Sequence, residues 1–172
     1  FGGRANTVFL WIGGATQIPY AGLSAGRNLS LSSEDIEVIR NTVPELDLLS
    51  GINSYGGFRN SQFITRKNNS GAFSTRGVEP ELLKIAGYRI DRGRFINALD
   101  YSERRKVAVI GTEVLDILFE EGEDPIGENI RIGNINFQVI GVYRSFSSGS
   151  GARGEARRIL LPNSTLRTTF NQ

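Results

Sequence analysis

Carboxylates are the side chains of this sequence with the widest scope for chemistry, because the chain contains no histidine and no cysteine. That composition excludes disulfides, thiolate catalysis, the usual general base and most zinc sites. Pairs of acidic residues can still exchange protons with a substrate or hold Mg²⁺ or Ca²⁺. The candidate pairs are Asp100 with Glu103 and Asp35 with Glu45. Neither pair lies in a motif that would tune a carboxylate pKa, so a carboxylate-dependent hydrolase of the cell envelope is the alternative and not the main interpretation.

A glycine-rich segment contains a second pattern with possible chemistry. Residues Gly149 to Gly154 read G-S-G-A-R-G, which formally matches a dinucleotide-binding fingerprint. A working fingerprint opens a helix directly after a strand, whereas the chain here leads into another predicted strand from Arg157 to Leu161. We therefore predict no cofactor in this chain. Phe146 to Arg158 lacks apolar periodicity and is rich in serine, glycine and arginine, so we expect a mobile loop.

Charge is distributed unevenly along the chain, although the formal net charge is only +2. One stretch has no basic residue between Lys106 and Arg131 and is acidic at Glu113, Asp116, Glu120, Glu121, Glu123, Asp124 and Glu128. The last part is basic at Arg144, Arg153, Arg157, Arg158 and Arg167. Patches of opposite sign could attract a partner, although solvated surfaces explain them more simply. Possible partner contacts are Phe146, Arg153 and Arg157, and no basic groove with interleaved aromatic residues indicates nucleic acid.

The elements that position these residues are clearest in the second half. Val107 to Gly111 is a short apolar run typical of a strand buried on both faces. Thr112 can cap a following helix with an apolar stripe. Asp124 to Gly127 has the chemistry of a type I turn. Alternating apolar residues from Ile130 to Val139 flank Gly133-Asn134, which predicts a two-residue hairpin.

The first half mixes helices and strands. Ser32 and Asp35 predict a capping box at the start of a helix that Pro44 ends. A second, short helix is predicted from Pro80 to Ala86, and a final helix is predicted to begin at Asn163. Further segments have strand-like composition: Thr7 to Ile12, Leu46 to Leu49, Gln62 to Arg66 and Ala72 to Val78, the last two joined by a predicted loop at Asn68 to Gly71. The order of elements indicates an α+β fold.

The motifs of the second half, taken in order, resemble the periplasmic core domain of MacB-like ABC transporter permeases. In that family a Gly-Arg-Phe turn precedes an acidic residue, a Val-Ala-Val-Ile/Leu-Gly strand, a Leu-Phe helix end, a Pro-Ile/Val-Gly turn and a Phe-x-Val-Ile-Gly-Val strand. The same series occurs here and is followed by Leu160-Leu161-Pro162. The residues that carry this structural signature are Gly93, Arg94, Phe95, Asp100, Gly111, Phe119, Pro125, Gly127, Gly141 and Pro162.

The resemblance implies a two-lobed α+β domain, with a porter-like mixed α/β lobe and an inserted, smaller, β-rich lobe. We expect residues 1–90 to form the first part of the porter-like lobe and residues 91–143 to form the inserted lobe. Residues 144–172 would contain the flexible loop and the return to the porter-like lobe. The resemblance implies no catalytic, cofactor-binding or metal-ligating residue in this chain, so it is not expected to be an enzyme.

The function implied by the resemblance is mechanotransmission. ATP bound to an associated nucleotide-binding domain would be hydrolysed in the cytoplasm, and this domain would move substrate or a partner on the periplasmic face of a bacterial inner membrane. The implied partners are the membrane helices of the same transporter, a periplasmic adaptor, an outer-membrane channel and a second copy of the domain. Lipoprotein extraction or regulation of wall hydrolases is the alternative within the family. The absence of methionine suggests a piece of a longer protein, and the resemblance implies that this longer protein is a membrane protein.

Overall fold

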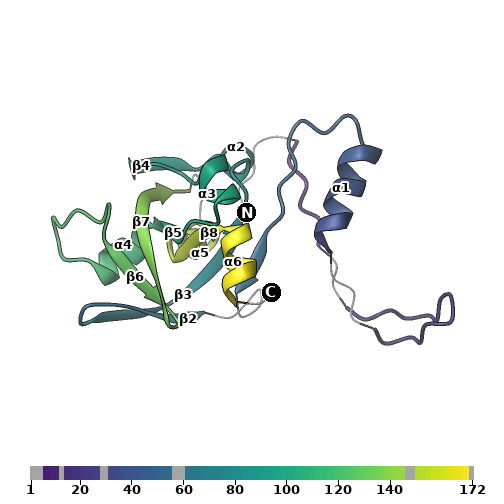
Figure 1. The fold of residues 1–172 in the computed structure, drawn as a ribbon, viewed down its shortest axis with the longest axis horizontal. Coiled ribbons are helices and arrows are strands. Elements are labelled where there is room, and N and C mark those ends of the chain that lie inside the picture. The colour runs from purple at the N-terminus through teal and green to yellow at the C-terminus, as the bar shows by residue number, and fades with distance from the viewer. Residues whose placement is uncertain (1–5, 12–13, 28–30, 56–60, 146–149, 171–172) are drawn as a thin grey trace. The chain divides into compact units, whose positions relative to one another are not determined.

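The computed structural model describes residues 6–11, 14–27, 31–55, 61–145 and 150–170, which fall into two compact units, 6–49 and 50–172 (Figure 1). The helices are α1 (Ser33–Thr42), α2 (Leu82–Ala86), α3 (Ala98–Ser102), α4 (Thr112–Leu118), α5 (Ser150–Ala156) and α6 (Asn163–Phe170). The strands are β1 (Asn53–Tyr55), β2 (Gln62–Arg66), β3 (Asn69–Val78), β4 (Arg89–Gly93), β5 (Val107–Gly111), β6 (Asn129–Ile132), β7 (Ile135–Arg144) and β8 (Arg158–Pro162). The predicted α+β class is confirmed.

Residues 6–49 contain one helix and one tight hairpin. The predicted capping box of α1 is confirmed, since the Ser32 amide donates to Asp35 Oδ2 at 2.6 Å and the Asp35 amide donates to Ser32 Oγ at 3.3 Å. The predicted strands at Thr7 to Ile12 and Leu46 to Leu49 are wrong for their described residues, which are not in a strand. Their β-prone composition finds no neighbouring strand in the described part of this unit.

Residues 50–172 form one eight-stranded mixed sheet. Its strands follow the order β1-β3-β2-β6-β7-β5-β8, with β4 added on β7. Because β8 also pairs with β3, in parallel from Ser74 to Val78, the pairings close a ring of β3, β2, β6, β7, β5 and β8. The hairpin predicted at Gly133-Asn134 is confirmed by the pairing of Ile132 with Ile135. Closure leaves few free strand edges, which makes this unit a stiff frame.

Two apolar cores lie on opposite faces of β5, β7 and β8. Ala108 and Ile110 point into one core with Phe73 and Phe137, while Val109 points into the other with Tyr143 and α2. All five residues of β5 are buried, so the predicted strand with two buried faces is confirmed. The first core is covered by α4 and α6, whose Leu118 and Leu166 have no exposed surface.

Several boundaries differ from the sequence prediction. The strands expected in a separate lobe at 91–143 share one sheet with β1 to β3 and β8, and the compact units divide between Leu49 and Ser50. The turn between β2 and β3 lies at Lys67-Asn68, because Arg66 pairs with Asn69. The helix α4 begins at Thr112 with Gly111 as N-cap and no side-chain cap. No helix in the described part of the chain is long and apolar enough to cross a bilayer.

Candidate functional site

The signature glycines bring two backbones into contact where β4 ends beside β7. Gly93 and Gly141 are register partners, and the Arg94 amide donates to the Ile140 carbonyl at 2.8 Å. A Cβ on Gly141 would lie 2.1 Å from the Arg94 carbonyl oxygen, and one on Gly93 would lie 2.2 Å from that of Ile140. Gly93 also has a φ of +68°. Both positions therefore require glycine on steric grounds, and Gly93 on conformational grounds as well.

An ion pair between a half-exposed arginine and a buried carboxylate fixes the turn that follows β4. The Arg94 guanidinium donates to both Asp100 oxygens, at 2.5 and 3.1 Å, and Asp100 has no exposed surface. Asp100 also closes the capping box of α3, because it accepts from the Asn97 amide at 3.0 Å. Burial raises the pKa of Asp100, but the hydrogen bonds from Arg94 and Asn97 outweigh it and hold the pKa below its ordinary value. A substrate could not reach this carboxylate, so its role is structural.

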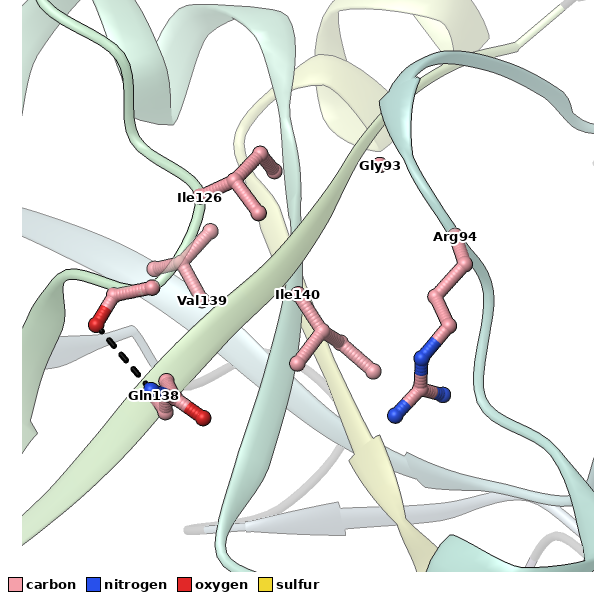
Figure 2. A pocket seen from close by; sticks show the side chains of 7 residues that line it. Gly93, Arg94, Ile126, Gln138, Val139 and Ile140 are labelled. Carbon is pink, nitrogen blue, oxygen red and sulfur yellow. Dashed lines mark hydrogen bonds between the residues drawn. The ribbon is translucent and has the colours of Figure 1, made fainter.

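A shallow depression of about 370 Å³ lies along β7 between the end of β4 and the turn before β6. It is lined by Gly93, Arg94, Ile126, Gly127, Gln138, Val139 and Ile140. Figure 2 shows the apolar side chains of Ile126 and Val139 next to each other and that of Ile140 on the side of Arg94. Gln138 Nε2 donates to the Gly127 carbonyl at 3.1 Å. Its lining includes no carboxylate and no hydroxyl, so this surface offers contact and not acid–base chemistry.

The remaining signature residues lie at other joints of the same unit. Gly111 is where α5 meets the sheet, because a Cβ there would lie 2.3 Å from the Ala156 carbonyl oxygen. Phe119 is buried beneath Arg66, whose guanidinium carbon is 4.0 Å from the ring centroid. Pro125 is buried and begins a turn one residue later than the predicted one at Asp124 to Gly127, since the Glu128 amide donates to the Pro125 carbonyl at 3.2 Å. Pro162 ends β8 opposite Val78. Phe95 is buried in the second core. The structure therefore gathers Gly93, Arg94, Asp100, Gly127 and Gly141 together and leaves the others apart.

The mobile loop predicted at Phe146 to Arg158 is wrong where the structure describes it. Residues 150–156 form α5, and Glu155 anchors this helix in a buried polar cluster that sequence analysis missed. The Tyr88 hydroxyl donates to Glu155 Oε2 at 2.7 Å, the Tyr143 hydroxyl donates to the Glu155 carbonyl at 2.8 Å, and Arg158 pairs with its other carboxylate oxygen. The one feature of the sequence that could have indicated this cluster is Glu155, a single glutamate among the arginines of a glycine-rich segment.

The buried cluster perturbs its own titratable groups. Burial, with Glu155 adding to it, raises the pKa of Tyr88, and burial likewise raises that of Tyr143. Burial and then the charge of Arg158 lower the pKa of Arg76 to about 10. The two tyrosines therefore stay neutral and Arg76 stays charged near neutral pH, and the hydrogen bonds to Glu155 hold α5 in place.

The predicted partner contacts have different surroundings. Arg153 is exposed on α5. Arg157 is already used within the domain, where it donates to Glu113 at 2.5 Å and to the Ala72 carbonyl at 3.2 Å. Phe146 lies outside the described residues. Of these three residues, Arg153 is the one with a described side chain that is exposed and forms no hydrogen bond or ion pair with another described residue.

Several carboxylates of the acidic stretch and of the candidate pairs form hydrogen bonds or ion pairs within the domain and so stabilise the fold. Arg66, almost fully buried, donates to Glu123 at 2.5 and 2.9 Å and to Glu128 at 2.9 Å. Glu103 binds Arg105 at 2.8 Å, and Asp35 binds Ser32 at the start of α1. Within the described residues no group of three or more acidic side chains could hold a metal ion. Glu45 is exposed.

The whole chain, residues 1–172, matches the family described as MacB-like periplasmic core domain. The chain belongs to this family. It is 33% identical over 138 residues to the macrolide export ATP-binding/permease protein MacB of Bdellovibrio bacteriovorus, covering 80% of this chain and 20% of that protein. It is 33% identical over 104 residues to the pyoverdine export ATP-binding/permease protein PvdT of Pseudomonas entomophila, covering 60% of this chain and 16% of that protein.

Solved structures show the same fold. The periplasmic region of MacB from Actinobacillus actinomycetemcomitans superposes with a TM-score of 0.66 at 17% identity, covering 92% of this chain and 67% of that one. The extracellular domain of the transporter YknZ from Gram-positive bacteria gives a TM-score of 0.65 at 17% identity, covering 83% and 67%. The chain is thus a periplasmic domain of a MacB-like permease, and it spans a fifth or less of the two curated relatives described above.

Proposed function

We propose that this domain transmits motion, coupling ATP hydrolysis on a cytoplasmic nucleotide-binding domain to export on the far side of the membrane. The observation that carries the proposal is the construction of residues 50–172 as a stiff body. A closed ring of strands has a core on each face, and its joints are made by backbone contacts at Gly93, Gly111 and Gly141. Such a body can pass on a displacement without absorbing it.

The names of the relatives support export as the task, because both MacB and PvdT are named as export ATP-binding/permease proteins. The proposal extends to a nucleotide-binding domain that binds ATP, to membrane helices of the same transporter, and to a second copy of the domain. A periplasmic adaptor and an outer-membrane channel complete the proposed assembly. The geometry disfavours Asp100 as the carboxylate of the alternative hydrolase, since Asp100 is buried against Arg94.

The experiment uses spin labels on the intact transporter that contains this domain. The chain has no cysteine, so Ser102→Cys and Asn134→Cys introduce unique labelling positions in this domain, and both residues are exposed. Between the nucleotide-free and ATP-trapped states, the distance from Ser102 to Asn134 within one copy should stay constant. The distance between the two Asn134 positions of a dimer should change.

Two results would contradict the proposal. A change of the distance within one copy as large as that between copies would mean that the domain deforms. A constant distance between copies, under conditions in which the transporter hydrolyses ATP and exports, would mean that this domain does not move with the cycle. An export assay on the labelled transporter is the control that the labels leave it active.

A further inference from the structure

The longest uncharged stretch of the first unit ends in a tight hairpin with an apolar tip. No charged residue occurs between Arg4 and Arg27, in a chain whose composition is 22% charged. Within this stretch, Thr16 and Arg27 face each other across the hairpin, since the Thr16 amide donates to the Arg27 carbonyl at 2.9 Å. The tip exposes Ile18 and Tyr20, at 73% and 76% of their surfaces.

Two backbone hydrogen bonds close a turn at this tip. Tyr20 and Leu23 exchange two hydrogen bonds, at 3.1 and 2.9 Å, around Ala21-Gly22. Ala21 and Gly22 both have positive φ, at 48° and 79°, as in the type I′ turns that join antiparallel strands. Because the amide and carbonyl groups of Tyr20 and Leu23 are paired, moving this part of the tip backbone out of water costs less than it would for an open loop.

We propose that this hairpin, residues 16–27, inserts its tip into the outer surface of the lipid bilayer beside which the domain sits. Ile18, Pro19 and Leu23 supply apolar surface, and Tyr20 is one of the two residue types that favour the bilayer interface. Arg27 lies at the base of the hairpin, where its Nε donates to the Ser24 carbonyl at 3.0 Å and its terminal nitrogens would meet lipid phosphates while the tip contacts acyl chains. A protein partner would instead be expected to pair polar groups around the rim, and the tip from Ile18 to Leu23 offers no charged side chain.

The inference rests on the family's position at the membrane and not on the transmission of motion. The bilayer contact would hold the first unit at a fixed depth. Export and the distance changes measured above test motion, whereas the experiment below measures only lipid contact, so the two proposals fail separately.

The experiment places a tryptophan reporter on the tip. Trp11 is the only tryptophan, so the variant Trp11→Phe/Tyr20→Trp reports from the tip alone. The matched control is Trp11→Phe/Phe63→Trp, because Phe63 is a 69% exposed aromatic residue on β2 of the other unit. Each whole chain is anchored through an N-terminal histidine tag to vesicles of phosphatidylethanolamine and phosphatidylglycerol that carry a nickel-chelating lipid. The chain has no histidine of its own to compete with the tag.

The emission of the tip reporter should shift to shorter wavelength and be quenched by lipids brominated on their acyl chains. The Phe63 reporter should show neither effect. Adding Ile18→Ser/Leu23→Ser to the tip reporter should abolish the quenching, with the circular dichroism of the chain unchanged. An unquenched tip reporter overturns the proposal and leaves the tip as a surface for protein. Equal quenching of both reporters, or quenching that survives the serine substitutions, overturns it as well.

Discussion

Residues 50–172 bury side chains on both faces of their central strands, whereas no described residue from Asn6 to Leu49 is buried. A shortage of apolar residues does not explain this difference in burial. Val8, Trp11 and Tyr20 are exposed at 88%, 76% and 76% of their surfaces, while other valine and tyrosine residues, such as Val109 and Tyr143, are buried in the cores of the other unit. What differs is the presence of a sheet on which apolar side chains can converge. The stability of this chain therefore resides in residues 50–172, and residues 6–49 present surface.

The largest loss of stability is expected for a substitution at the contact between β4 and β7. Gly141→Ala should destabilise residues 50–172 by about 3 kcal/mol or more, because the new Cβ meets the Arg94 carbonyl oxygen and neither backbone can yield. Chemical denaturation followed by circular dichroism measures the change. The matched control is Gly154→Ala in α5, where a Cβ meets nothing within 4 Å. That variant should be neutral or slightly stabilising; equal losses in both variants would mean that the close contact at Gly141 is unimportant.

The second largest loss of stability is expected for a substitution in the ion pair next to this contact. Arg94→Ala removes both hydrogen bonds from the guanidinium to Asp100 and leaves a buried carboxylate with the Asn97 amide at 3.0 Å and Arg105 at 3.7 Å. We expect a loss of about 2 kcal/mol in the free energy of unfolding. Arg89→Ala is the control, because Arg89 is exposed and its nitrogen is 3.8 Å from Asp91; its loss should stay below about 0.5 kcal/mol. Similar losses for the two variants would contradict a structural role for the Arg94 pair.

A smaller effect should appear in acid. Arg66 first, and then Lys67, lower the pKa of Glu123 from 4.5 to about 2. A carboxylate whose pKa is lower in the folded state contributes stability that is complete above its unfolded pKa, and this stability is lost as the pH falls toward about 2. Denaturation curves between neutral pH and that limit should show this loss for the natural chain. The loss should be smaller for Arg66→Gln and unchanged for Glu121→Gln, whose carboxylate is exposed in the same loop.

The sequence predicts local structure well where one short motif decides it. The capping box of Ser32 and Asp35, the two buried faces of β5 and the turn at Gly133-Asn134 each depend on neighbours in the chain. The lobe boundaries could not be predicted in this way, because β8 joins β3 across 84 positions of sequence, from Ser74 to Arg158. Such a pairing has no local signal.

The site shows the same limit. The resemblance singles out Gly93, Arg94, Asp100 and Gly141, but the reason for these residue types, a backbone contact and an ion pair with a buried carboxylate, appears only in three dimensions. The helix α5 was missed because its glycine-rich sequence has low helix propensity. Glu155 outweighs that low propensity because it forms hydrogen bonds with Tyr88 and Tyr143 and an ion pair with Arg158. The two tyrosines lie in other parts of the fold, and Arg158 follows the end of α5.

The smallest loss of stability is expected for the largest change to the chain, the deletion of the surface unit. Deleting residues 6–49 should alter the free energy of unfolding of residues 50–172 by less than about 1 kcal/mol, because no described residue from Asn6 to Leu49 is buried. Deleting residues 163–172 is the matched control, since it also removes one terminal helix. That helix carries Leu166, which has no exposed surface, and Phe170, whose ring is 3.9 Å from that of Tyr55. The control should therefore unfold the domain or lower its melting temperature strongly. If the first deletion were as damaging as the second, residues 6–49 would have to supply core to the sheet, and the division of this chain into a stable unit and a surface unit would fail.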